Sequence, residues 1–142
     1  ETQGIIESTG PNMKRFIFSV SDAANLVIRN INNIDITKGK ILSMKMKASK
    51  VSNLLQTWEK LYGTKWIEID RRLGESDHES MIGEIEMKYT TEILIDNTAH
   101  FLTSVRDPLE KHITNTFTTE SAESHNEEEM TQLIKLGMQH ES

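Results

Sequence analysis

The residues best suited to chemistry lie in one short charged segment, where residues 71–75 read Arg-Arg-Leu-Gly-Glu. Gly74 permits a tight loop in which the backbone approaches a ligand closely. The planar guanidinium of Arg72 suits a pyrophosphate, and the carboxylate of Glu75 suits hydrogen bonds from ribose hydroxyls. A charged, solvated surface turn is the competing interpretation, and the segment by itself fits either one.

The sequence lacks the common catalytic signatures. It contains no G-x-G-x-x-G dinucleotide motif, no phosphate-binding P-loop and no G-x-S-x-G nucleophile elbow. The five histidines are scattered without H-E-x-x-H spacing, so His78-Glu79 is only a weak candidate for a metal site. We therefore expect no metal, no cofactor held by this chain and no catalysis by the chain alone.

The overall charge argues against a nucleic-acid-binding protein. The formal net charge is −6 at pH 7, whereas general nucleic-acid binders need a basic face that neutralises phosphates. The lysine-rich stretch at residues 38–50 is a local exception, which either attracts an anionic ligand or forms a solvated surface. We expect no nucleic-acid partner.

The residue types also bear on the compartment. The chain contains no cysteine, which excludes disulfides, thiolate zinc sites and cysteine nucleophiles. No apolar run approaches the roughly 20 residues of a membrane helix, and no signal peptide is visible. These features fit a cytoplasmic protein without a membrane partner. Because residue 1 is Glu rather than Met, we expect the chain to begin inside a longer polypeptide.

Hydrophobic periodicity predicts three helices, which together with short strands indicate an α+β fold. The first helix covers residues 22–32, with Ser21 as its expected N-cap. The second carries a single apolar stripe and ends at Gly63, which suits the left-handed position after a helix. The third follows Asn126, with Glu129 three residues later as in a capping box.

Short strands are expected between the helices, because apolar or alternating segments occur there. These segments are residues 16–20, 40–46, 66–69, 92–95 and 100–105. The last two flank a turn at Asp96-Asn97, as in a hairpin. A loop is expected from Pro108 to Ser124.

Four segments resemble, in order and spacing, the motifs of one family. Residues 72–79, Arg-Leu-Gly-Glu-Ser-Asp-His-Glu, resemble the Arg-Pro-Gly-Glu-Lys-x-His-Glu motif of polysaccharide-biosynthesis nucleotide-sugar dehydratases, such as UDP-N-acetylglucosamine 4,6-dehydratases. Residues 10–16, Gly-Pro-Asn-Met-Lys-Arg-Phe, are similar to the Pro-x-Met-Thr-Arg-Phe element of that family. Residues 39–46 look like its Gly-Glu-Ile-Phe-Val-Pro-Lys-Met strand, and residues 118–134 resemble its Ser-rich turn and closing helix.

The resemblance implies an extended short-chain dehydrogenase. In that architecture an N-terminal Rossmann half holds NAD(P) and a Tyr-x-x-x-Lys catalytic pair, and a smaller C-terminal lobe closes over the nucleotide-sugar. We expect the chain to be this substrate-binding lobe over residues 1–136, with a frayed tail at 137–142 and without the Rossmann half. Its expected partners are a nucleotide-sugar and a Rossmann half in the same or another chain. The sequence is also compatible with a homo-oligomer.

The resemblance assigns roles only at matching positions. Arg72 matches the arginine that contacts the nucleotide diphosphate, and Glu75 matches the glutamate near the ribose. Arg15 and Met13 match positions near the substrate cleft. The complete enzyme would be an NAD(P)-dependent nucleotide-sugar dehydratase or epimerase, a lyase or an isomerase, in polysaccharide biosynthesis.

Three positions depart from the family pattern. Leu73 replaces a proline in the loop, Ser76 replaces a lysine, and Lys14 replaces a threonine. A degenerate, non-catalytic interaction or ligand-sensing module is therefore the alternative function.

Overall fold

Five helices and nine short strands form between residues 4 and 138, the part of the chain that the computed structural model describes. The predicted α+β class is confirmed, and two further helices of four residues each join the three that were predicted. The elements fall into two units, each described by itself. Within the described residues, unit 1 contains 4–17, 47–79 and 119–138, and unit 2 contains 18–46 and 80–118.

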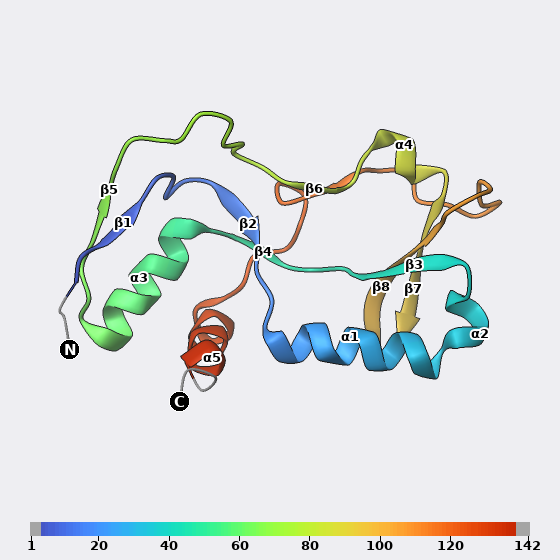
Figure 1. The fold of residues 1–142 in the computed structure, drawn as a ribbon, viewed down its shortest axis with the longest axis horizontal. Helices are drawn as coiled ribbons and strands as arrows, with labels where there is room; N and C mark the ends of the chain where they lie inside the picture. The colour runs from blue at the N-terminus through green and yellow to red at the C-terminus, as the bar shows by residue number, and fades with distance from the viewer. Residues whose placement is uncertain (1–3, 139–142) are drawn as a thin grey trace. The chain divides into compact units, whose positions relative to one another are not determined.

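Unit 1 is built from two small sheets and two helices (Figure 1). Its strands are β1 (Ile6–Ser8), β2 (Lys14–Phe16), β4 (Ala48–Lys50) and β5 (Trp66–Glu68). β1 pairs with β5 in parallel, and β2 pairs with β4 antiparallel. The helices α3 (Val51–Tyr62) and α5 (Glu127–Met138) pack against each other. The buried apolar residues of this unit are Met13, Ala48, Leu55, Ala122, Met130 and Ile134.

The ends of the unit 1 helices follow the local signals in the sequence. Gly63 adopts φ 73 after α3, as predicted, and its N–H donates to the Glu59 carbonyl. At the start of α5, Glu129 N–H donates to Asn126 Oδ1 and Asn126 N–H donates to Glu129 Oε2, each at 2.9 Å. The predicted capping box is therefore confirmed. Gly137 is still helical, and residues 139–142 of the predicted tail lie outside the described residues.

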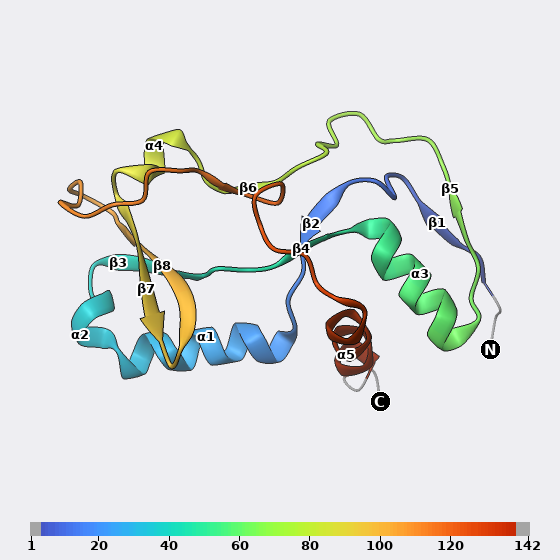
Figure 2. The same cartoon turned by 180° about the vertical axis from the view of Figure 1, so that it is seen from behind.

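Unit 2 is organised around a three-stranded antiparallel sheet of order β3-β8-β7. Its strands are β3 (Lys40–Met44), β6 (Ser80–Ile82), β7 (Thr90–Ile95), β8 (Thr98–Ser104) and β9 (Phe117–Thr118). Its helices are α1 (Val20–Asn32), α2 (Ile34–Thr37) and α4 (Glu84–Met87). Figures 1 and 2 show the turn between β7 and β8 lying beside α1. An ion pair joins the two, with Arg29 Nε 3.5 Å from Asp96 Oδ2.

The β7–β8 hairpin confirms the predicted turn. Asp96 and Asn97 have φ 50 and φ 59, and two successive positive φ values are typical of the two-residue turns that match strand twist. In the core of the unit the rings of Phe101 and Phe117 lie 4.9 Å apart. No helix among residues 4–138 is long and apolar enough to cross a membrane.

Three local predictions were wrong. The N-cap of α1 is Ser19, not Ser21, because the Ser19 hydroxyl accepts from Asp22 N–H while Asp22 Oδ2 accepts from Ser19 N–H, each at 3.0 Å. This reciprocal pair starts the helix at Val20, which the prediction had placed in a strand at 16–20. The strand observed here, β2, covers Lys14–Phe16 and shares only Phe16 with that prediction. The predicted loop to Ser124 contains β9, which pairs with β6.

Candidate functional site

The charged segment predicted to carry the chemistry folds into a tight turn, which we call the arginine loop (residues 71–77). Gly74 adopts φ 86, in the left-handed region that glycine enters without steric cost. Glu75 N–H donates to the Arg72 carbonyl at 3.3 Å, and Arg72 N–H donates to Glu75 Oε2 at 3.1 Å. The Glu75 side chain therefore closes the turn that presents Arg72.

The carboxylate of Glu75 also ties the arginine loop to the N-terminal segment. The hydroxyl of Thr9 donates to Glu75 Oε1 at 2.9 Å. This hydrogen bond is the main cause that lowers the pKa of Glu75 below its usual value. Partial desolvation raises the pKa, whereas the backbone hydrogen bond from Arg72 and the charge of Arg72 lower it further. Each carboxylate oxygen keeps a second lone pair, so Glu75 can still accept a hydroxyl from a ligand.

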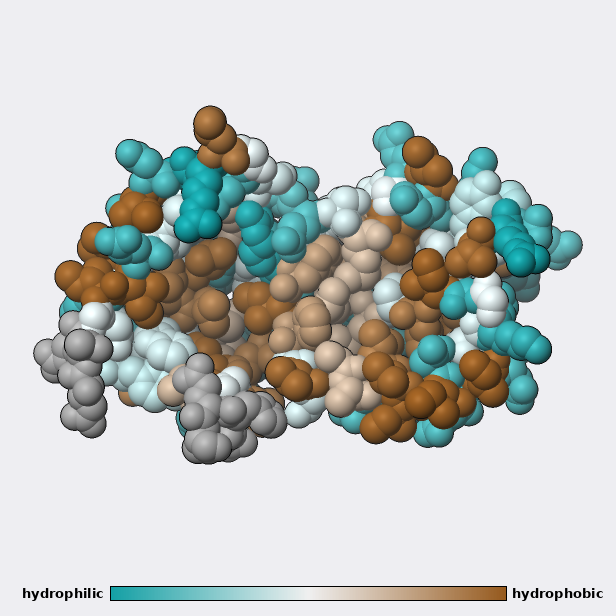
Figure 3. Space-filling model, viewed as in Figure 1, coloured by the Kyte–Doolittle hydropathy of each residue, from teal (hydrophilic) through white to brown (hydrophobic). Residues whose placement is uncertain are grey.

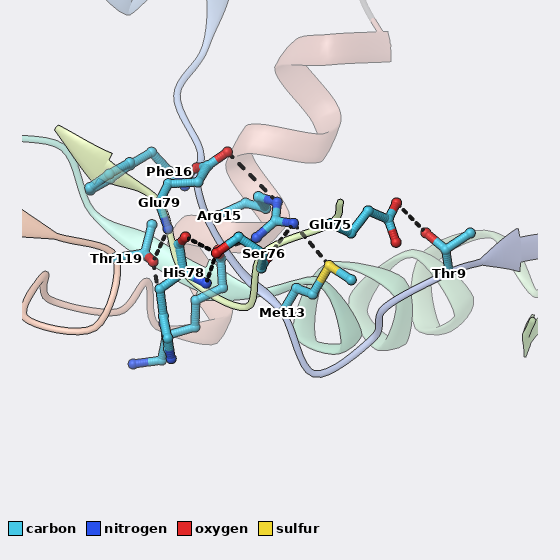
Figure 4. A network of polar contacts seen from close by, with 10 residues as sticks. Thr9, Met13, Arg15, Phe16, Glu75, Ser76, His78, Glu79 and Thr119 are labelled. Atoms are coloured by element: carbon cyan, nitrogen blue, oxygen red, sulfur yellow. Dashed lines mark hydrogen bonds and ion pairs between the residues drawn. The ribbon is translucent and has the colours of Figure 1, made fainter. Parts of the chain in front are cut away.

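A second anchor of the loop is Arg15, on β2. One of its nitrogens, Nη2, lies 2.9 Å from the Ser76 carbonyl oxygen and 2.9 Å from Met13 Sδ. Its Nε lies 3.7 Å from Glu79 Oε1. Figure 4 shows the guanidinium between these three partners. Arg15 thus links β2 to the arginine loop at Ser76 and to Glu79, which follows the loop.

Met13 lies beneath Arg15 and is 4% exposed. It packs so closely on Gly10 that a Cβ atom on Gly10 would lie 2.2 Å from Met13 Cε and 2.7 Å from Met13 Cγ. The thioether sulfur of Met13 is a weak acceptor, and it accepts a hydrogen bond from Arg15 Nη2. The predicted site residue Met13 is therefore a buried support for the Arg15 guanidinium.

The end of the motif, residues 76–79, is fixed by further contacts that sequence reasoning missed. Glu79 Oε2 accepts from Phe16 N–H at 3.2 Å, and Glu79 N–H donates to the hydroxyl of the fully buried Thr119 at 3.0 Å. The Ser76 hydroxyl donates to the His78 carbonyl at 2.7 Å. Glu79 belongs to the motif at residues 72–79, so the sequence could have identified it as a site residue. No sequence motif singles out Thr9 or Thr119.

The guanidinium of Arg72 is arranged differently from that of Arg15. Arg72 is exposed, and its side chain makes no hydrogen bond or ion pair with any residue between 4 and 138. Its neighbour Arg71 is engaged, since Arg71 Nη2 lies 2.8 Å from Asp77 Oδ1. The four residues that precede Arg72 in the chain line an open surface cleft: Glu68, Ile69, Asp70 and Arg71. Arg72 therefore keeps its full set of donors for a ligand.

All four predicted site residues lie in unit 1. Arg15 and Met13 are in direct contact, and Arg72 and Glu75 share one turn. The two pairs meet through the Ser76 carbonyl, one residue beyond Glu75. Three or more metal-ligating side chains do not gather anywhere in the described part of the chain. The arrangement is suited to holding an anionic, hydroxylated ligand.

One solved structure similar to this chain is the X-ray structure of Pen from Bacillus thuringiensis. The two are 22% identical, with a TM-score of 0.74, and the match covers 98% of this chain and 41% of the Pen chain. The likeness concerns the fold, and the chain spans less than half the length of Pen. No curated protein matches the chain.

A family comparison covers most of the sequence. The family model described as "Polysaccharide biosynthesis protein" matches residues 1–99, a range that includes β1 to β7, the arginine loop and its anchor Arg15. The chain therefore belongs to the polysaccharide biosynthesis protein family.

Proposed function

We propose that this chain is the nucleotide-sugar-binding lobe of an NAD(P)-dependent sugar 4,6-dehydratase or epimerase, and that it is not catalytic alone. Membership of a polysaccharide biosynthesis family supports the general role. The observation that carries the proposal is the guanidinium of Arg72, which makes no hydrogen bond or ion pair with the described residues. The turn that presents it contains Gly74 at positive φ and is closed by the hydrogen bond from Arg72 N–H to Glu75. A bidentate guanidinium is well suited to a diphosphate.

Each residue of the site has a distinct part in this proposal. Arg72 binds the diphosphate of a UDP-sugar, and Glu75 accepts ribose hydroxyls through its remaining lone pairs. Arg15 and Met13 are positioning residues, because Arg15 holds the arginine loop through the Ser76 carbonyl and Met13 supports the Arg15 guanidinium. The binding energy fixes the sugar relative to a reactive group supplied from elsewhere.

The redox chemistry belongs to the other half of the enzyme. A nicotinamide cofactor accepts and returns a hydride, and the protein contributes placement. The sequence of this chain has no glycine-rich dinucleotide motif, and the largest sheet among its described residues is a three-stranded antiparallel one. These features fit a nucleotide-sugar lobe better than a cofactor-binding half, whose sheet is parallel.

The proposal is tested by isothermal titration calorimetry of the chain with UDP-N-acetylglucosamine, UDP and free N-acetylglucosamine. The expected result is binding of UDP-N-acetylglucosamine and of UDP, and none of the free sugar, because the site recognises diphosphate and ribose. If neither UDP ligand binds, the site has lost its ligand. That outcome would favour the second candidate, a non-catalytic interaction module. This candidate is supported by Ser76, which replaces the lysine of the family's loop motif.

A further inference from the structure

Two lysines stand directly opposite each other on the strands next to the arginine loop. Lys14 on β2 is the Cα partner of Lys50 on β4. The Val51 N–H donates to the Met13 carbonyl beside this pair, so the pair is of the non-hydrogen-bonded kind, in which opposite side chains lie closest. Their Cβ atoms are therefore about 4.5–5.5 Å apart. Two ammonium groups thus extend from the same face of the β2–β4 sheet.

Neither ammonium group is neutralised by the part of the chain that the structure describes. The side chains of Lys14 and Lys50 make no hydrogen bond or ion pair with any residue between 4 and 138. Three other lysines of unit 1 do have carboxylate partners: Lys47 with Glu129, Lys60 with Glu127 and Lys65 with Glu59. Like charges directly opposite on a sheet are destabilising. An anion bound between Lys14 and Lys50 would remove this repulsion.

The acidic residues beside β2 are already engaged by arginines. Asp77 Oδ1 lies 2.8 Å from Arg71 Nη2, and Glu79 Oε1 lies 3.7 Å from Arg15 Nε. Both carboxylates are therefore held by cations other than the two lysines. Figure 3 shows hydrophilic surface, in teal, around the arginine loop and β2.

The backbone of Lys14 fixes its place relative to the arginine loop. Lys14 N–H donates to the Asp77 carbonyl at 3.0 Å, on the side of β2 that faces away from β4. The next residue, Arg15, holds the loop through the Ser76 carbonyl. β2 therefore lies between β4 and the loop, and the lysine pair belongs to the same unit as the loop that presents Arg72.

We propose that Lys14 and Lys50 bind a second acidic group of the ligand, and that this group is a carboxylate on the sugar. The inference rests on the proposed function, in which Arg72 binds the diphosphate. Apart from the diphosphate, the nucleoside of a UDP-sugar is neutral, so a further acidic group is carried by the sugar. The family motif has a neutral threonine where this chain has Lys14. The lysine pair therefore assigns an acidic nucleotide-sugar to this chain as its substrate class.

An acidic sugar also bears on the reaction. In a uronic acid a carboxylate occupies C6, the position from which a 4,6-dehydration removes a hydroxyl as water. Such a sugar can still be epimerised at C4, because that reaction leaves C6 unchanged. Of the two activities in the proposed function, a uronic acid therefore permits the epimerase.

UDP-glucuronic acid and UDP-glucose are matched probes, because they differ only in the carboxylate at C6. Calorimetry of the chain with both gives the contribution of that carboxylate. We expect UDP-glucuronic acid to bind about fivefold more tightly, a modest factor because Lys14 is half-buried and Lys50 is exposed. In Lys14→Gln and in Lys50→Gln this preference should fall below about twofold. Lys38→Gln removes an exposed lysine of unit 2 and should keep the preference.

Equal dissociation constants for the two probes in the unaltered chain overturn the acidic-sugar site and leave the proposed function standing. A preference that persists in both lysine variants, or that is also lost in Lys38→Gln, overturns the role of the pair. Inorganic phosphate tests for a free anion: if its binding depends on Lys14 while the two probes bind alike, the pair serves a separate anion and the acidic sugar is overturned. If neither UDP probe binds, the proposed function itself fails, and the acidic sugar with it.

Discussion

Arg15 donates a hydrogen bond to the carbonyl oxygen of Ser76 at 2.9 Å, across 61 residues of sequence. This contact joins β2 to the arginine loop, and with the ion pair to Glu79 it places a second cation beside the loop that presents Arg72. The contact explains how two separate motif segments form one site.

Arg15→Ala should loosen the arginine loop without unfolding unit 1. Arg15 is only partly buried, so we expect a loss of about 0.5–1.5 kcal/mol in the free energy of unfolding. Amide hydrogen exchange at residues 72–79 should become faster, as measured by mass spectrometry. Arg106→Ala, an exposed arginine in unit 2, is the control. Unchanged exchange at 72–79 in Arg15→Ala would contradict the anchoring role.

Thr9→Val should raise the pKa of Glu75 toward its usual value, because the Thr9 hydroxyl is the main cause of its depression. A depressed carboxylate pKa stabilises the fold above the unfolded-state value, which is 4.5 for this group, and the contribution is lost as pH falls through the folded pKa. The Glu75 carboxyl titration followed by NMR gives the pKa directly. Thr9→Ser, which keeps the hydroxyl, should titrate like the unaltered protein. If Thr9→Val titrates in the same way, the hydrogen bond does not set the pKa.

Gly10→Ala should displace Met13, since the added Cβ would lie 2.7 Å from Met13 Cγ. We expect a cost of about 1–3 kcal/mol in unfolding free energy, as for an overpacked core. Gly137→Ala is the comparison, because a Cβ there meets no atom within 4 Å. Since Gly137 lies in α5, that substitution should raise the unfolding free energy by about 0.5–1 kcal/mol. Chemical denaturation of both variants gives the comparison. Equal stabilities would show that Met13 can move aside.

Local signals in the sequence correctly predicted the C-terminal end of α3 and the N-terminal end of α5. Gly63, Asn126 and Glu129 act within one helical turn, so their neighbours in sequence are their partners in space. The same kind of signal was misplaced at α1, where Ser21 was the expected N-cap. Asp22 stands three residues after Ser19, which is the spacing of a capping box, and only one residue after Ser21.

The rest of the site depends on contacts between distant residues. The hydrogen bond between Thr9 and Glu75 spans 66 residues, and that between Glu79 and Thr119 spans 40. No periodicity or motif pairs such positions. Periodicity likewise identified that Val27 and Ile31 share a face of α1, but it does not say what covers that face.

The most direct test of the account is calorimetry of UDP-N-acetylglucosamine with the unaltered chain, Arg72→Ala and Arg106→Ala. The side chain of Arg72 makes no hydrogen bond or ion pair with residues 4–138, so its removal should leave the melting temperature unchanged. The account predicts a loss of about 1.5–3 kcal/mol in binding free energy, about 10- to 150-fold in Kd, for Arg72→Ala. Arg106→Ala should bind like the unaltered chain. Equal dissociation constants for all three proteins would contradict the central claim.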